Sequence, residues 1–204
     1  MTYMNRSSAL RCALICSVAL LLLPLTAMAH TSIAGAGDFV TGLLNPLTTP
    51  GHILILIGLG LLAGQHPPVQ LKYTIGTFVS VLTISLLLTT TSYVVAVSST
   101  VIFCLALVVG ILVALELQLF LIICCVLFAT AGALIGLDSV VEAGAVQSPF
   151  TTLAGTWVSA TFLLVDIPIY TCNANKKWMK IGIRVTGSWI AAIAMLVLAF
   201  HFRK

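Results

Sequence analysis

Residues 37–64 decide the fold and read GDFVTGLLNPLTTPGHILILIGLGLLAG. The first half of this stretch is polar and broken by Pro46 and Pro50, and the second half is an uncharged apolar run that contains one histidine, His52. Thr49 can cap a helix, and proline suits the first position of a helix. A helix is therefore predicted to begin at Pro50 and to hold His52 in its first turn.

This helix is too short to cross a bilayer alone. It has 15 residues up to Gly64, about 22 Å of helix, whereas a hydrocarbon core is about 30 Å thick. The segment Phe39–Leu47 is therefore predicted to complete the span as a broken or re-entrant piece. Interrupted helices at membrane depth are where transporters place binding groups. The alternative is that the prolines only start a helix near the membrane surface, where water reaches His52.

Composition indicates a polytopic membrane protein. Of the 204 residues, 60% are hydrophobic and 7% are charged, and the mean hydropathy is +1.20. Soluble domains carry about 25% charged residues. The sequence has no dinucleotide, P-loop or nucleic-acid motif and no nucleophile–base or paired-acid pattern. We therefore expect no enzyme, no permanently bound cofactor and no nucleic-acid partner.

The N-terminus is typical of a cleavable signal peptide. Arg6 and Arg11 precede an apolar stretch, and an A-x-A cleavage site ends at Ala29. The signal peptide is predicted to be residues 1–29; an uncleaved anchor helix is the alternative. Cleavage after Ala29 makes His30 the new N-terminus, where the terminal amine and the imidazole can chelate one metal ion.

The mature chain, residues 30–204, is predicted to be one all-α transmembrane domain of about six helices. The expected spans are about 39–64, 72–91, 94–115, 119–137, 151–170 and 181–200. An exported N-terminus and six spans put both mature termini in the periplasm of a bacterial inner membrane. The positive-inside rule agrees, because this topology puts most of the mature chain's basic residues inside. They are Lys72, Lys176, Lys177, Lys180 and Arg184.

The same topology collects polar groups in the outer half of the protein. Imidazole, carboxylate and a free amine together form a weak site for a divalent first-row metal. His30, His52 and Asp138 are the main predicted ligands. Weaker candidates are Asp38, Asn45 and Glu142, because solvated loops often contain such residues.

Other polar residues lie away from this group. Asp166 is the one acid well inside a span, and an intramembrane acid suggests function. It is a further weak candidate for the cation path, although Pro168 nearby makes a structural hydrogen bond equally plausible. His66 and His201 are expected at the membrane interface.

Two pairs of glycines have GxxxG spacing, Gly60 with Gly64 and Gly132 with Gly136. This spacing puts both glycines on one face and lets helix backbones approach closely. We interpret both pairs as packing sites within the chain, with dimerisation as the less favoured alternative.

The leader, the histidine after it and the stretch 37–64 resemble the HupE/UreJ family, small membrane proteins linked to nickel or cobalt uptake for hydrogenase and urease. That family carries an HPxxGxDH motif at the head of its first span. Here residues 45–52 align with it. Pro46 and His52 match, whereas Asn45, Thr49 and Gly51 replace a histidine, a glycine and an aspartate.

A second family motif, similar to HGxAHGxE, aligns with residues 131–138. Both glycines match and Asp138 stands where the family has glutamate, but Ala131 and Ile135 replace the two histidines. The resemblance extends over most of the chain, because the leader, the six spans and the basic loop also agree.

The resemblance implies an inner-membrane permease for a nickel or cobalt cation, or a urease or hydrogenase accessory protein, with a reduced set of ligands. The alternative from another class is a membrane scaffold or assembly factor that no longer transports. A third idea is a carrier for a small neutral solute that uses the Thr/Ser-rich second span. Expected partners are the lipid bilayer, the divalent cation, and either a second copy of the chain or an accessory membrane protein.

Overall fold

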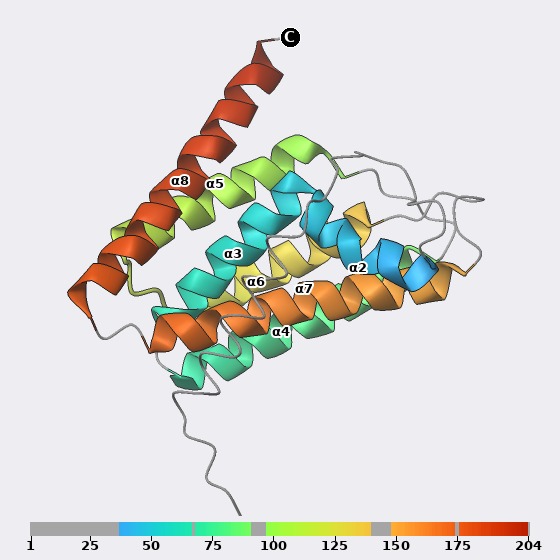
Figure 1. The fold of residues 1–204 in the computed structure, drawn as a ribbon, viewed down its shortest axis with the longest axis horizontal. Coiled ribbons are helices and arrows are strands. Elements are labelled where there is room, and N and C mark those ends of the chain that lie inside the picture. The colour runs from blue at the N-terminus through green and yellow to red at the C-terminus, as the bar shows by residue number, and fades with distance from the viewer. Residues whose placement is uncertain (1–36, 67, 91–96, 140–147, 174–175, 204) are drawn as a thin grey trace, which may run out of the picture. The chain divides into compact units, whose positions relative to one another are not determined.

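The structure, a computed structural model, describes residues 37–66, 68–90, 97–139, 148–173 and 176–203. The chain divides into two compact units, residues 1–31 and 32–204, and all described residues belong to the second unit. The described residues are helical and contain no strand (Figure 1). The helices are α2 (Asp38–Thr48), α3 (Pro50–Gly64), α4 (Pro68–Leu88), α5 (Ser99–Leu115), α6 (Leu121–Asp138), α7 (Pro149–Cys172) and α8 (Lys177–Phe202).

The protein is a multi-pass membrane protein. Among the described residues, α4, α6, α7 and α8 are long and apolar enough to cross a membrane, and α2 with α3 makes a fifth span if a bent pair is counted. The two helices of this pair are bent by 72°, which confirms the predicted break in the first span. Six spans were predicted, and α5 accounts for the difference. It has only 17 residues, the lower limit for a span, because it begins at Ser99 rather than near residue 94.

Helix α3 lies at the centre of the packing. The other helices pack mainly as three pairs, α2 with α7, α4 with α6 and α5 with α8, and α3 contacts members of all three pairs. Figure 1 shows α3 between α5 and α7. Ile55, Leu56, Leu59 and Leu62 on α3 are 0% exposed. A helix that is apolar on all sides belongs in the interior of a bundle, and α3 has that position.

Both GxxxG pairs pack within the chain, as predicted. Gly60 and Gly64 lie against Ile167 and Thr171 of α7. Gly132 and Gly136 lie against α4, where a Cβ on Gly132 would meet the carbonyl oxygen of Phe78 at 2.8 Å. Each pair therefore supports the contact between two helices of one chain.

Two other close contacts use glycines that do not form such pairs. Gly42 of α2 and Gly155 of α7 each lie against the backbone of the other helix. Gly110 of α5 approaches α8, where an added Cβ would meet the backbone nitrogen of Ala191 at 2.7 Å. Gly187 of α8 approaches α5 in return. Small residues thus let helix backbones approach in all three pairs.

The contacts also show that α3, α5 and α7 run in the same direction. Gly51 and Gly58 of α3 face Ile102 and Val109 of α5, and the contacts of Gly60 and Gly64 with α7 have the same order. Helices α4, α6 and α8 run in the opposite direction. We call the end where α3 begins the His52 end and the end where it finishes the Gln65 end.

The basic residues predicted inside all lie at the Gln65 end, in or next to the first turns of α4 and α8. They are Lys72, Lys176, Lys177, Lys180 and Arg184. Their common end is what the positive-inside rule requires of a cytoplasmic face.

Replacement of Gly155 by alanine is expected to lower the free energy of unfolding by about 1–3 kcal/mol, because the new Cβ has no room against the α2 backbone. Thermal unfolding of the detergent-solubilised protein measures the change. The control is Gly182→Ala, at an exposed helical position with nothing within 4 Å of the added Cβ. Equal melting temperatures for the two variants would contradict the packing described.

Candidate functional site

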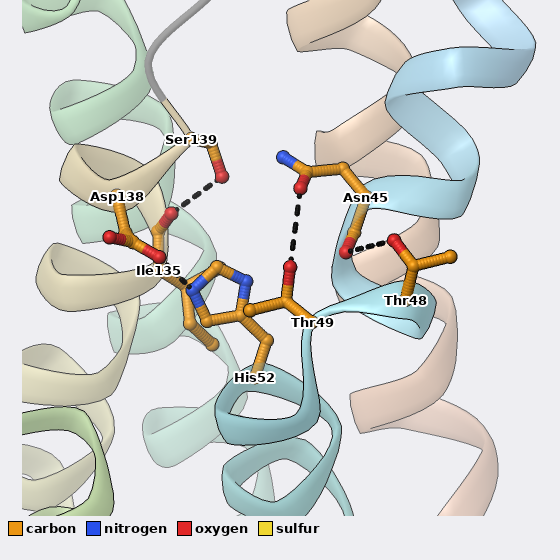
Figure 2. A network of polar contacts seen from close by, with 7 residues as sticks. All are labelled: Asn45, Thr48, Thr49, His52, Ile135, Asp138 and Ser139. Carbon is orange, nitrogen blue, oxygen red and sulfur yellow. Dashed lines mark hydrogen bonds and ion pairs between the residues drawn. The ribbon is translucent and has the colours of Figure 1, made fainter. Parts of the chain in front are cut away.

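The site begins at the break between α2 and α3. Thr49 is the N-cap residue of α3 and Pro50 follows it, as predicted, but the Thr49 side chain does not cap the helix. Its hydroxyl instead donates to Oδ1 of Asn45 at 3.5 Å, and the Thr48 hydroxyl donates to the carbonyl oxygen of Asn45 at 3.3 Å (Figure 2). Local bonds of this kind compete with regular helix and stabilise a bend.

His52 lies in the first turn of α3 and is 0% exposed. Its Nε2 atom is 2.9 Å from Oδ2 of Asp138, the last residue of α6, whose side chain is 28% exposed (Figure 2). The two atoms are close enough for an ion pair, but they lack the alignment of a hydrogen bond. Neither ring nitrogen of His52 has a hydrogen-bond partner among the described residues.

Two helix ends of opposite polarity meet at this contact. The N-terminus of α3 carries the positive end of its dipole, and the C-terminus of α6 carries the negative end. The Asp138 carboxylate therefore benefits from α3 but is disfavoured by its own helix. A positive charge beside Asp138, either a proton on the imidazole or a bound cation, relieves that repulsion.

The contact allows two modes of cation binding. In the first, the Asp138 carboxylate attracts a proton to Nε2 and so favours that tautomer, which leaves the Nδ1 lone pair free to bind a metal; carboxylates often support histidine ligands in this way. Figure 2 shows Nδ1 on the side of the ring where Asn45 and Ser139 lie. In the second mode, Nε2 and the carboxylate bind the same ion. In either mode a cation satisfies a buried nitrogen that would otherwise cost about 1–3 kcal/mol.

The weaker candidates lie in different places. Asn45 belongs to the polar network at the break. Asp38 lies elsewhere, because its Oδ2 atom accepts a 2.6 Å hydrogen bond from the backbone N–H of Ser148 at the start of α7. Asp166 is half-buried on α7 and has no hydrogen bond or ion pair to another described residue. Its neighbour Ile167 packs near the Gln65 end, so Asp166 is separate from His52.

The signal peptide, His30 and Glu142 lie outside the described residues, so the structure does not test them. Within the part of the chain that it describes, no three His, Cys, Asp or Glu side chains are grouped so that they could hold a metal ion. His52 and Asp138 are brought together as predicted, and their role as metal ligands stays a prediction.

His66 differs from the expected interfacial histidine, because it is 6% exposed and bonded at both ring nitrogens. Nδ1 lies 2.8 Å from the carbonyl oxygen of Leu62, and Nε2 accepts the backbone N–H of Leu119 at 3.0 Å. This pattern requires the neutral ring with its proton on Nδ1. His66 thus ties the end of α3 to the chain before α6, a structural role that sequence signals near His66 do not reveal.

The chain matches the family model described as HupE / UreJ protein over residues 18–197. No curated protein and no solved structure matches it.

Replacement of His66 by alanine is expected to lower the free energy of unfolding by about 1–3 kcal/mol, because the buried imidazole is lost and the partly buried Leu119 N–H loses its partner. The exposed His201 supplies the matched control, His201→Ala. Thermal unfolding of both purified variants measures the difference. A His66 variant as stable as the control would show that the ring is not a structural tie.

Proposed function

The chain belongs to the HupE/UreJ family, and we propose that it is a permease that moves a nickel or cobalt cation across the membrane through a site at His52 and Asp138. Membership implies a nickel or cobalt permease or an accessory role, in a membrane protein rather than an enzyme. One observation carries the finer proposal. A fully buried histidine, without hydrogen bonds, contacts a carboxylate at the break of a membrane helix.

The proposed ligands are those of a reduced site. His52 supplies one imidazole nitrogen and Asp138 a carboxylate oxygen, and His30 supplies its imidazole and amine once the signal peptide is removed. Asn45 and Glu142 are weaker additional candidates. A site with few imidazoles and relatively more oxygen binds first-row metals more weakly, and nickel is expected to bind more tightly than cobalt.

The proposed topology has the His52 end facing the periplasm of a bacterial inner membrane. Helix α5 is then the sixth span, and both mature termini are periplasmic. The common position of the basic residues at the Gln65 end supports this orientation. Function as a homo-oligomer and function with an accessory membrane partner both fit this topology.

Transport requires the protein to change shape. On the side of His52 that leads towards the Gln65 end, the side chains of Ile55, Leu56 and Leu59 are 0% exposed. The described conformation is therefore closed to a cation. The 72° bend at Thr49 supplies a hinge at which α2 can move relative to α3. The sequence has no ATP-binding motif, so an ion gradient or another subunit must drive uptake.

A second function, that of a scaffold or assembly factor without transport, is favoured by one specific observation. Ala131 and Ile135 stand where the family motif has histidines, and both are 0% exposed within the apolar core. The positions of two imidazoles are therefore filled by hydrocarbon. A protein that retains only the fold of its family would show this pattern.

Metal binding to the purified, correctly cleaved protein separates the two functions. His30→Ala, His52→Ala and Asp138→Asn are each expected to weaken Ni²⁺ and Co²⁺ binding by roughly 10–100-fold, as measured by titration calorimetry. Cellular uptake of both metals is expected to fall in the same variants. His201→Ala removes an exposed histidine and controls for loss of a surface imidazole. Absence of binding at millimolar metal would favour the scaffold.

Replacement of Ile135 by histidine tests the site by adding a ligand instead of removing one. Residue 135 is one helical turn before Asp138, so the new imidazole is expected on the same side of α6. Nickel affinity is expected to rise about tenfold. Ala133→His, on another side of α6, controls for a histidine in this helix. Equal affinities in these two variants would contradict the proposed position of the ion.

A further inference from the structure

A cavity of about 170 Å³ lies at the Gln65 end, away from His52. The ends of α3, α5 and α7 and the beginning of α8 surround it, and its polar lining comes from Gln65, Glu116, Thr171, Cys172 and Lys180. A water molecule occupies about 30 Å³ in the liquid. The cavity therefore has room for an ion with part of its water shell.

Gln65, which lines this cavity, has an unsatisfied acceptor. Its Nε2 atom donates to the carbonyl oxygen of Val113 at 3.1 Å, and its backbone oxygen accepts from Nε2 of Gln118 at 3.4 Å. These bonds fix the residue, yet its Oε1 atom is buried and has no hydrogen-bond partner among the described residues. A buried acceptor in this state is satisfied by water or by a ligand.

Glu116 lines the same cavity and has an uncommon backbone conformation. Its φ of 53° is in the left-handed region, and its N–H bonds to carbonyl oxygens at the end of α5. Glycine or asparagine usually ends a helix in this way, because other residues are strained there by about 1–2 kcal/mol. No ion pair joins Glu116 to Lys180 within the described part of the chain, so the carboxylate is available to a ligand.

The helix ends around the cavity favour a cation. Three helix C-termini, those of α3, α5 and α7, lie around it, and each carries a partial negative charge. The Thr171 hydroxyl donates to the carbonyl oxygen of Ile167 at 3.0 Å, so its lone pairs are left as acceptors. Lys180, the N-terminus of α8 and Arg184, whose Nε donates to the carbonyl oxygen of Ala114 at 3.0 Å, oppose this field. Acceptors nevertheless predominate over donors.

We propose that this cavity is a second cation site, in which a divalent cation in its water shell is held between the Glu116 carboxylate and the Gln65 side-chain oxygen. Such hydrated binding needs few protein ligands. The proposal rests on the proposed function, because the same ion would bind at His52. The two sites are 13 residues apart on α3, about 20 Å. Lys180 competes with the ion for Glu116 and so favours release.

Cys172 provides a local reporter, because its exposed thiol belongs to the cavity. The experiment measures how fast a hydrophilic maleimide labels Cys172 of the full-length protein in nanodiscs as Co²⁺ is raised, with Cys172→Ser as the labelling control. Co²⁺ is expected to slow labelling. In Glu116→Gln the half-protecting concentration should rise about tenfold, the effect of removing a unit charge about 6 Å from a divalent ion in water.

The Lys180→Gln variant is expected to shift the half-protecting Co²⁺ concentration in the opposite direction. Removal of the competing ammonium should lower the half-protecting Co²⁺ concentration roughly threefold. An anion site would show the reverse, with protection by inorganic phosphate that depends on Lys180, and would overturn the proposal. Protection by Co²⁺ that is unchanged in Glu116→Gln would also overturn it, because the thiol alone would then account for binding.

The His52→Ala variant separates this inference from the proposed function. If Cys172 is still protected in His52→Ala while calorimetry shows no loss of metal binding, the cavity site stands and the site at His52 fails. If His52→Ala loses metal binding and Cys172 is never protected, the proposed function stands and the second site is wrong.

Discussion

The break at Thr49 is the constraint on which the structure depends. Pro50 has no backbone N–H, so α2 cannot continue into α3 as one regular helix. The Thr48 and Thr49 side chains bond back to α2, which satisfies polar groups that lipid would not. The resulting bend lets α2 pack on α7 while α3 passes through the centre of the bundle. The first turn of α3, with His52, is therefore buried among the other helices.

Helix α3 can lie in the centre of the bundle because its backbone approaches neighbouring helices closely. Lipid tails are as apolar as the side chains of α3, so the hydrophobic effect does little to hold helices together within a bilayer. Glycines at the contacts of α3 with α5 and α7 allow dense packing instead. The side chains of Ile55, Leu56 and Leu59 between the two ends of α3 are accordingly 0% exposed.

The sequence predicted the features that depend on local signals. The bounds of α3, the broken span and the two GxxxG packing faces agree with the structure, because proline, glycine and apolar runs act through neighbouring residues. The position of His52 and Asp138 at the same end of the bundle followed from alternating span directions, and their direct contact did not. The cap that Asp38 forms on Ser148, 110 residues away, could not be predicted, because it depends on how α2 turns at the break. The burial of His66 and the cavity beside Gln65 depend in the same way on tertiary packing.

The polarity of α3 gives the two ends different roles. Its positive N-terminus would repel a cation at the proposed site beside His52, so the proposed binding there depends on Asp138 and on the negative end of α6. Its negative C-terminus would attract a cation at the proposed Gln65 site, where the ends of α5 and α7 add to the field and the basic residues of α8 oppose it. Each proposed site thus combines attraction with repulsion. Such a balance would let an ion leave as well as enter, which efficient conduction requires.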